Sequence, residues 1–261
     1  MKIQELFQKQ QHKTLIHYDI YELTLAERLK YTFLAMGVIY IMGLLFYNHH
    51  VIALMLSFLG LFYPKLKKPD LVKKRKQALK AQFKEMIYAL SSSLGAGKSI
   101  ESAFKAVLKD LRILYPNPQT SIIMELEYIV RKIEMNETIE EAIEDFAKRA
   151  SIDDITNFSN VFTTAKRTGG NIISIIAYTS RTISEKMEIQ NEIEVLVASK
   201  QFEQKILSLL VPLIIVYLQI SSPGYLNVMY TSLQGRVLMT ISLIIFMISY
   251  KVGQKITNIE V

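Results

Sequence analysis

Two pairs of strongly apolar segments, separated by a long charged stretch, constrain the fold of this chain more than any other feature. The first pair is Tyr31–Tyr47 and Val51–Tyr63, and the second is Ile206–Ile220 and Val237–Tyr250. Apolar runs of this kind predict helices that cross a lipid bilayer. Because a short, mostly polar segment joins the members of each pair, we expect two helical hairpins and about four transmembrane helices.

The second arm of the first hairpin, Val51–Tyr63, is short for a full crossing. Tyr47 and Tyr63 suit the two membrane interfaces, and Lys65 and Lys67 can extend towards the headgroups. A complete crossing is the simplest interpretation, and a re-entrant second arm is the alternative.

Positive charge is concentrated directly after the first pair. Residues 65–80 hold eight Lys and Arg against Asp70 alone, whereas Asn48–His50 and Ser221–Gly235 hold none. By the positive-inside rule the chain from Lys65 onward is cytoplasmic, and four spans then put both termini in the cytoplasm. The expected location is the cell (inner, cytoplasmic) membrane, as a multi-pass protein. We expect the basic run to contact anionic lipid headgroups, so the net charge of +7 does not indicate a nucleic acid partner. The first 30 residues are polar and mixed in charge, and the first span is therefore expected to serve as its own insertion signal.

The stretch between the two pairs shows the helical period repeatedly and the strand period hardly at all. Four apolar stripes carry this pattern: Leu79, Phe83, Met86, Ile87, Leu90, Leu94; Ile100, Ala103, Phe104, Val107, Leu108, Leu111; Ile122, Leu126, Ile129, Val130, Ile133; and Ile139, Ala142, Ile143, Phe146, Ala147, Ala150. The predicted fold class is an all-α integral membrane protein with a cytosolic helical bundle. The expected division is an N-terminal cytosolic segment (1–30), a transmembrane hairpin (31–63), a basic juxtamembrane linker (64–82), the cytosolic bundle (83–205), the third and fourth transmembrane helices (206–250) and a cytosolic tail (251–261).

Three helix starts share a pattern in which a capping residue precedes an apolar one. They are Ser99–Phe104, Thr138–Ile143 and Asn171–Ile176. Ordinary capped amphipathic helices explain the pattern, and internal duplication is the alternative. Thr138 with Glu141, and Ser151 with Asp154, also have the spacing of capping boxes.

One long helix is expected to lead into the third span. After Gly169-Gly170 no Gly or Pro occurs from Asn171 to Val211, and the apolar stripe continues towards the membrane. A kink near Lys200–Lys205 is the alternative.

The sequence Gly95-Ala96-Gly97-Lys98-Ser99 ends like a phosphate-binding loop. Such a loop needs a further Gly where this chain has Ser92, and it must follow a buried strand, whereas the preceding residues have the helical period. We therefore interpret Gly95 and Gly97, like Gly169 and Gly170, as structural turns at helix ends.

No other motif predicts catalysis, a cofactor or a metal site. The chain has no Cys, so it has neither a disulfide nor a Cys-ligated metal. The adjacent pair His49-His50 is interpreted as an exposed polar turn, with a metal site as the alternative. The Glu140, Glu141, Glu144 and Asp145 side chains form an acidic helix face rather than a paired acid and base.

The stretch from about Phe83 to Pro212 resembles the F domain of type II secretion and type IV pilus platform proteins, and it is most similar to the shorter platform proteins of tight-adherence (Tad) pili. The resemblance rests on the order of several weak motifs between paired spans. They are Leu94–Gly97 followed by Ser99–Phe104, Thr138–Ala142 with Phe146–Arg149, Phe162–Ile172, Arg181–Ile183 and Leu207–Pro212.

The resemblance implies a non-enzymatic membrane platform without a cofactor that couples a cytosolic hexameric secretion ATPase to pilin insertion into the fibre. The implied partners are that ATPase, a pilin or pseudopilin, the lipid bilayer, and a paralogous platform protein or further copies of this chain. We expect the ATPase to contact exposed turns around Lys98, Arg149 and Arg167. The alternatives are a membrane receptor or signalling scaffold with a helical cytosolic bundle, and a transporter subunit, which the near absence of charge within the spans disfavours.

Overall fold

The computed structural model describes residues 16–257, and every regular element in that range is a helix. The predicted N-terminal segment (1–30) and C-terminal tail (251–261) therefore lie partly outside the described residues. The helices are α2 (Leu25–Tyr47), α3 (His50–Ser57), the 3-10 helix η1 (Phe58–Phe62), α4 (Tyr63–Gly95), α5 (Ile100–Leu114), α6 (Ser121–Glu134), α7 (Ile139–Ala150), α8 (Asp153–Thr168), α9 (Ile172–Ser221), α10 (Asn227–Thr231) and α11 (Leu233–Thr257). The prediction of an all-α chain is confirmed.

Four helical stretches are long and apolar enough to cross a membrane. They are Leu25–Tyr47, His50–Gly95, Ile172–Ser221 and Leu233–Ile256. Each contains one of the apolar segments from which four spans were predicted, so this part of the prediction is confirmed at the level of length and composition.

The chain folds into two compact units. The core unit comprises residues 16–22 and 69–187, and the span unit comprises residues 23–68 and 188–257. Helices α4 and α9 each contribute residues to both units.

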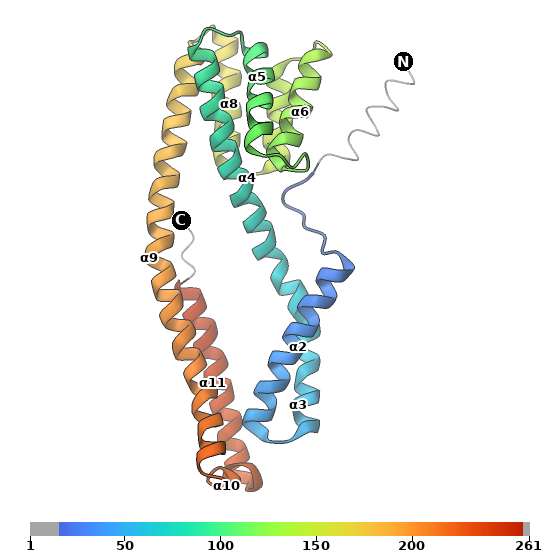
Figure 1. Cartoon of the computed structure of the whole chain (residues 1–261), viewed down its shortest axis with the longest axis vertical. Helices are drawn as coiled ribbons and strands as arrows, with labels where there is room; N and C mark the ends of the chain where they lie inside the picture. The colour runs from blue at the N-terminus through green and yellow to red at the C-terminus, as the bar shows by residue number, and fades with distance from the viewer. Residues whose placement is uncertain (1–15, 258–261) are drawn as a thin grey trace. The chain divides into compact units, whose positions relative to one another are not determined.

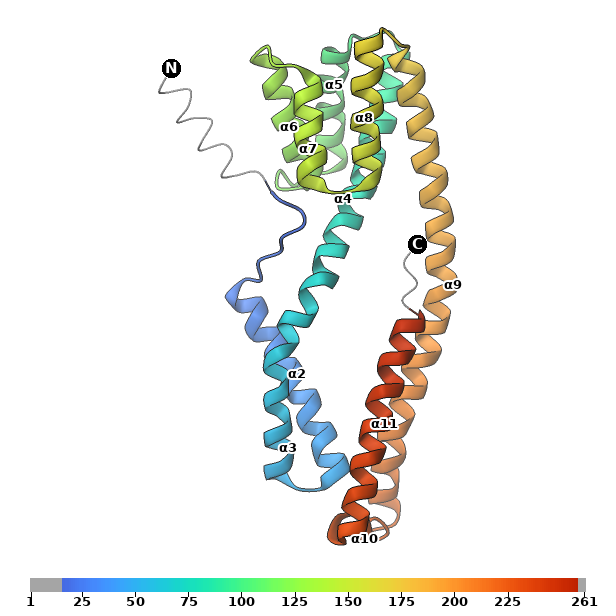
Figure 2. The ribbon, with the colours of Figure 1, turned by 180° about the vertical axis from the view of Figure 1, so that it is seen from behind.

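The core unit is built from antiparallel helices. Figures 1 and 2 show α5, α6, α7 and α8 side by side, next to the last turns of α4 and the first turns of α9. The α4–α5, α6–α7 and α8–α9 turns lie at one end of this unit, and the α5–α6 and α7–α8 turns lie at the other. We call the end with three turns the three-turn end.

The four predicted stripes form the hydrophobic core of this unit. All their residues are buried except Ile100 and Ile133, which are half-buried. The Phe83 ring lies among aromatic neighbours, with centroid distances of 6.2 Å to Phe146 and 5.6 Å to Phe158. Full burial of such a side chain contributes roughly 1.5–3 kcal/mol, so this cluster is a main source of the stability of the core unit.

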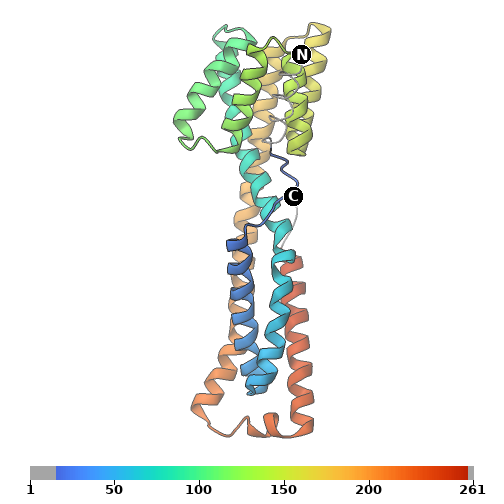
Figure 3. The same ribbon diagram turned by 90° about the vertical axis from the view of Figure 1, so that its right-hand side faces the viewer.

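In the span unit, α2 and α3 form the predicted hairpin, which Figure 3 shows from the side in blue and cyan. The helices approach closely at two glycines. A Cβ on Gly43 would lie 2.8 Å from the Cα of Ala53, and one on Gly60 would lie 2.8 Å from the backbone nitrogen of Met36. Small residues of this kind allow close helix packing within a membrane. The second arm continues through η1 into α4 without a loop.

The two hairpins of the span unit are joined by hydrogen bonds. The Tyr47 hydroxyl donates to Oγ1 of Thr240 at 3.0 Å, and the Tyr230 hydroxyl donates to the Leu45 carbonyl at 2.8 Å. The Gln219 side-chain amide donates to Tyr230 at 2.8 Å. These bonds satisfy polar side chains within an otherwise apolar surrounding, where an unpaired group would be costly.

Helix α9 runs without interruption for 50 residues, from Ile172 to Ser221. At 1.5 Å per residue its length is about 75 Å. The expected long helix is confirmed, and it stays helical through Lys200–Lys205, where a kink was the alternative. The segment expected as a basic linker, residues 64–82, lies within α4, which even includes Pro69.

Candidate functional site

The three turns of the three-turn end share one backbone geometry. Each contains a residue with a left-handed backbone, at φ values of 81° for Gly97, 60° for Asn136 and 70° for Gly169. In each turn, the N–H of the next residue donates a hydrogen bond to the carbonyl five positions earlier. The bonds run from Lys98 to Ser93 at 3.4 Å, from Glu137 to Lys132 at 3.0 Å, and from Gly170 to Ala165 at 2.8 Å. This is the Schellman arrangement, which satisfies carbonyls at a helix end.

The three repeated helix starts follow directly on these turns. Ser99, Thr138 and Asn171 each stand two residues after the left-handed residue. The Ser99 hydroxyl accepts from the Ser102 N–H at 3.3 Å, and the Asn171 side chain accepts from the Ser174 N–H at 3.1 Å. Thr138 has no such side-chain bond, so the capping box predicted for it with Glu141 is wrong.

The glycines predicted as structural turns occupy these positions. Gly95 is the last residue of α4, and Gly97 follows in the turn to α5. Gly169 ends α8, and a Cβ on Gly170 would lie 3.5 Å from the Ala165 carbonyl oxygen. A helix rather than a strand precedes Gly95, and the Lys98 N–H bonds within its own turn. The backbone amides therefore do not form the cradle that a phosphate-binding loop requires.

Lys98 and Arg167, two of the three residues expected to contact a partner, are exposed at the three-turn end. Two further cations there are paired: Lys166 with Glu140 at 2.8 Å, and Lys132 with Glu137. Burial alone would raise the pKa of Glu140, but the hydrogen bond and charge of Lys166 outweigh it and lower that pKa. This end is therefore a polar surface on which Lys98, Arg131 and Arg167 are exposed.

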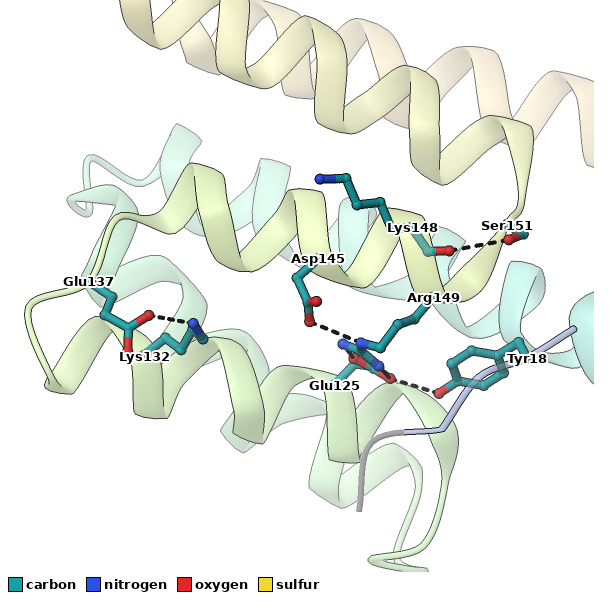
Figure 4. Close-up of polar contacts among 8 residues, drawn as sticks. All are labelled: Tyr18, Glu125, Lys132, Glu137, Asp145, Lys148, Arg149 and Ser151. Carbon is teal, nitrogen blue, oxygen red and sulfur yellow. Dashed lines mark hydrogen bonds and ion pairs between the residues drawn. The ribbon is translucent and has the colours of Figure 1, made fainter. Parts of the chain in front are cut away.

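Arg149, the third of these residues, does not lie in an exposed turn. Its side chain is 4% exposed, at the opposite end of α7 from the three-turn end, and it forms a bidentate pair with Glu125, which is 2% exposed. Both N–H···O distances to Glu125 are 2.6 Å, and a further bond of 2.9 Å reaches Asp145, as Figure 4 shows. The expected exposure is thus corrected, because a buried guanidinium is stable only when paired and hydrogen-bonded in this way.

Tyr18 completes the buried cluster. Its hydroxyl donates to Oε1 of Glu125 at 3.0 Å, and its backbone N–H donates to the Arg149 carbonyl at 3.1 Å. Burial, followed by the charge of Glu125, raises the pKa of Tyr18. The Arg75 guanidinium lies 5.2 Å from the centre of the Tyr18 ring, within range of a cation–π contact.

The sequence analysis missed this cluster, although the helical period contained a signal. Glu125 stands three residues after Ile122, and Arg149 stands three residues after Phe146. That spacing places both ionic residues on the apolar faces of their helices. Two opposite charges on apolar faces indicate a buried pair.

Asp154 is a second ionic junction, at the start of α8. Its carboxylate oxygens contact Lys80 of α4 at 2.9 Å and Lys186 of α9 at 2.8 Å. Burial raises the pKa of Asp154, but hydrogen bonds from both lysines outweigh it, so the pKa is lowered. The capping box predicted for Ser151 with Asp154 is wrong, because Ser151 ends α7 in the left-handed conformation with φ 49°. Ile152 precedes α8 instead.

Three of the four side chains on the acidic face of α7 pair with cations, beginning with Glu140 and Lys166. Glu144 pairs with Lys148 at 2.7 Å, and Asp145 pairs with Arg149.

His50 contacts the Tyr40 hydroxyl at 3.0 Å. Within residues 16–257, no three His, Cys, Asp or Glu side chains lie close enough together to hold a metal ion.

Comparisons of this chain with known protein families, with curated proteins and with solved structures find no match. The resemblance to pilus platform proteins therefore stays a prediction.

Proposed function

We propose that this chain is a membrane platform protein of a type IV or Tad-type pilus, or of a type II secretion assembly. In this proposal the core unit is cytosolic and contacts a hexameric secretion ATPase, where ATP is hydrolysed. The span unit lies in the cell membrane and helps pilin subunits leave the bilayer for the fibre. The chain itself acts as a mechanical link rather than as an enzyme.

Helix α9 is the observation that carries the proposal. Its first turns pack into the hydrophobic core through Ile176 and Ile183, and its last turns form the third apolar stretch. A continuous helix transmits displacement along its axis, because shortening or sharply kinking it requires breaking backbone hydrogen bonds. Pro212 lies within α9 and has no N–H to donate, but it stands beyond the core unit, in the apolar stretch. A platform that passes movement from an ATPase to membrane spans needs such an element.

The proposed orientation rests on the distribution of charge. Lys65 and Lys68 are exposed on α4 directly after the apolar second arm, and Lys251 and Lys255 are exposed at the end of α11. The turn between α2 and α3 holds no Lys or Arg. By the positive-inside rule, this distribution supports a cytoplasmic position for the core unit.

A helix-stiffness experiment tests the mechanical role. Inserting Gly-Gly after Glu194 lengthens α9 and loosens it, whereas inserting Ala-Ala lengthens and rotates it by the same amount but keeps it helical. Both variants are compared for membrane abundance and for the amount of pilin in sheared surface filaments. We expect filaments to be lost with Gly-Gly and retained with Ala-Ala. Normal filament levels with Gly-Gly would refute rigid transmission. Equal loss with both inserts would show that the register of α9 is required, and it would remove this experiment as support for stiffness.

The three-turn end is the proposed ATPase contact, because Lys98 and Arg167 are exposed there. Reversing both charges, Lys98→Glu with Arg167→Glu, is expected to reduce co-purification of the ATPase in mild detergent. Arg181→Glu is the matched control, since it changes an exposed arginine on α9 away from that end. Equal ATPase recovery from all three proteins would remove this surface from consideration.

A further inference from the structure

Three segments of the core unit continue into candidate membrane spans, and all three are held at the turn between α7 and α8. The segment 16–22, which we call the strap, leads into α2. Helix α4 follows directly on the second apolar arm, and α9 contains the third apolar stretch. The turn itself is only Ser151–Ile152, and the contacts made around it extend from Arg149, near the end of α7, to Asp154, near the start of α8.

The strap is held by the first half of this turn. The Arg149 carbonyl accepts the Tyr18 N–H, and the Ser151 carbonyl accepts a bond of 2.8 Å from the Lys76 ammonium. Lys76 also forms an ion pair with Asp19 of the strap. Because Tyr18 is fully buried, the strap cannot leave without exposing its aromatic ring and breaking its bond to Glu125.

The two long helices are held by the second half. Asp154 pairs with Lys80 on α4 and with Lys186 on α9, so a single carboxylate bridges both helices. The Asp154 side chain is 10% exposed, which means that water cannot readily replace either lysine. The left-handed Ser151 lies between the two halves and fixes the direction of the chain.

We propose that the α7–α8 turn is a coupling node, by which we mean a point that links the movements of the strap, α4 and α9. Asp154 is its positioning residue, because its carboxylate pairs with both long helices. Displacement of α9 would then also shift α4 and loosen or tighten the strap. This inference rests on the proposed function, in which α9 carries movement. It adds that movement reaches the first and second apolar arms as well as the third, through contacts inside the core unit.

The test measures hydrogen exchange of the Tyr18 amide in the full-length protein in mild detergent. Lys186→Gln removes the ion pair between α9 and Asp154. The substituted side chain is half-exposed, and Asp154 stays in place at the start of α8. Arg181→Gln is the matched control, because it removes an ion pair with Glu185 on the same helix that does not reach α8. Lys186→Arg keeps the charge and serves as the rescue variant.

We expect Lys186→Gln to speed exchange of the Tyr18 amide about fivefold, which corresponds to the loss of one partly buried ion pair. Arg181→Gln and Lys186→Arg should leave the rate unchanged. Equal rates in all four proteins would overturn the coupling. The exchange rates of core amides of α5 are measured in the same samples. If Lys186→Gln speeds exchange of the Tyr18 amide no more than exchange of these core amides, the coupling would also be overturned.

The exchange measurement does not depend on pilus assembly, so the two proposals can fail separately. If the Tyr18 amide responds while the Lys186→Gln strain assembles normal filaments, the node is supported and its use in a platform is refuted. If the amide does not respond, the node is refuted whatever the filament level.

Discussion

Replacement of Arg149 by Met should be among the most destabilising single changes in the core unit. Arg149 and Glu125 are both almost completely buried, so solvent does not screen their interaction. Met fills a similar volume but leaves the Glu125 carboxylate buried with Tyr18 as its remaining bonded partner. Removing one member of a buried ion pair costs about 3–5 kcal/mol, because the other charge stays uncompensated.

Hydrogen exchange of the slowest amides of α5 and α6 measures this cost in the full-length protein. A loss of about 3–5 kcal/mol corresponds to exchange that is roughly a hundredfold to several thousandfold faster. Lys148→Met is the matched control, since it makes the same change one residue earlier at an exposed pair with Glu144. That control should change the rate less than fivefold, because solvent screens an ion pair on the exposed surface.

A compensating variant separates charge from packing. Tyr18→Phe, Glu125→Leu and Arg149→Met together remove all three buried polar partners and leave apolar side chains. Because such replacements are often neutral or stabilising, this triple variant should exchange at nearly the wild-type rate. Destabilisation of the triple variant as large as that of Arg149→Met alone would refute the reasoning.

Three further predictions concern packing and pH. Gly43→Leu should lower the thermal aggregation temperature in detergent, because its Cβ would lie 2.8 Å from the Cα of Ala53, whereas Gly37→Leu, with no atom within 4 Å, should not. Phe83→Ala should cost about 3–5 kcal/mol in opening free energy measured by hydrogen exchange, and a loss below 1 kcal/mol would contradict the packing described. Since the native pKa of Asp154 is below its ordinary value of about 3.9, its ion pairs contribute fully above that pH and are lost as the pH falls through the native pKa. The melting temperature of the core unit should thus hold from pH 8 to 5 and fall below about pH 4, with a shallower fall in Asp154→Asn.

The helices with long apolar stripes could be predicted from the sequence, because periodicity reports burial directly. The absence of Gly and Pro after Gly170 likewise indicated the continuity of α9. The early start of α4 could not be read from its stripe, because residues 63–78 are rich in Lys and carry two prolines. Their helix formation depends on good helix formers such as Lys, Leu and Arg rather than on burial.

Details of the turns and buried charges were harder to predict. Ser151 has the residue type and spacing of a helix cap, but the close connection between α7 and α8 makes it the left-handed end of α7. The partner of Arg149 is 24 positions away on another helix, so local charge patterns could not reveal it. Thr24 and Glu27 form a capping box at the start of α2 that has the same signature and was overlooked.

The matching turns of the three-turn end make the helical hairpins of the core unit interchangeable at their tips. In each hairpin the chain reverses through the same left-handed position and the same returning hydrogen bond, although the residues differ. We therefore expect that exchanging the Gly97–Ser99 tip with the Asn136–Thr138 tip would not redirect the helices that follow. For an engineer, we expect this end to be the place for grafted loops or epitope tags. For an evolving lineage, it is a surface whose side chains can change while the backbone of the turns is kept.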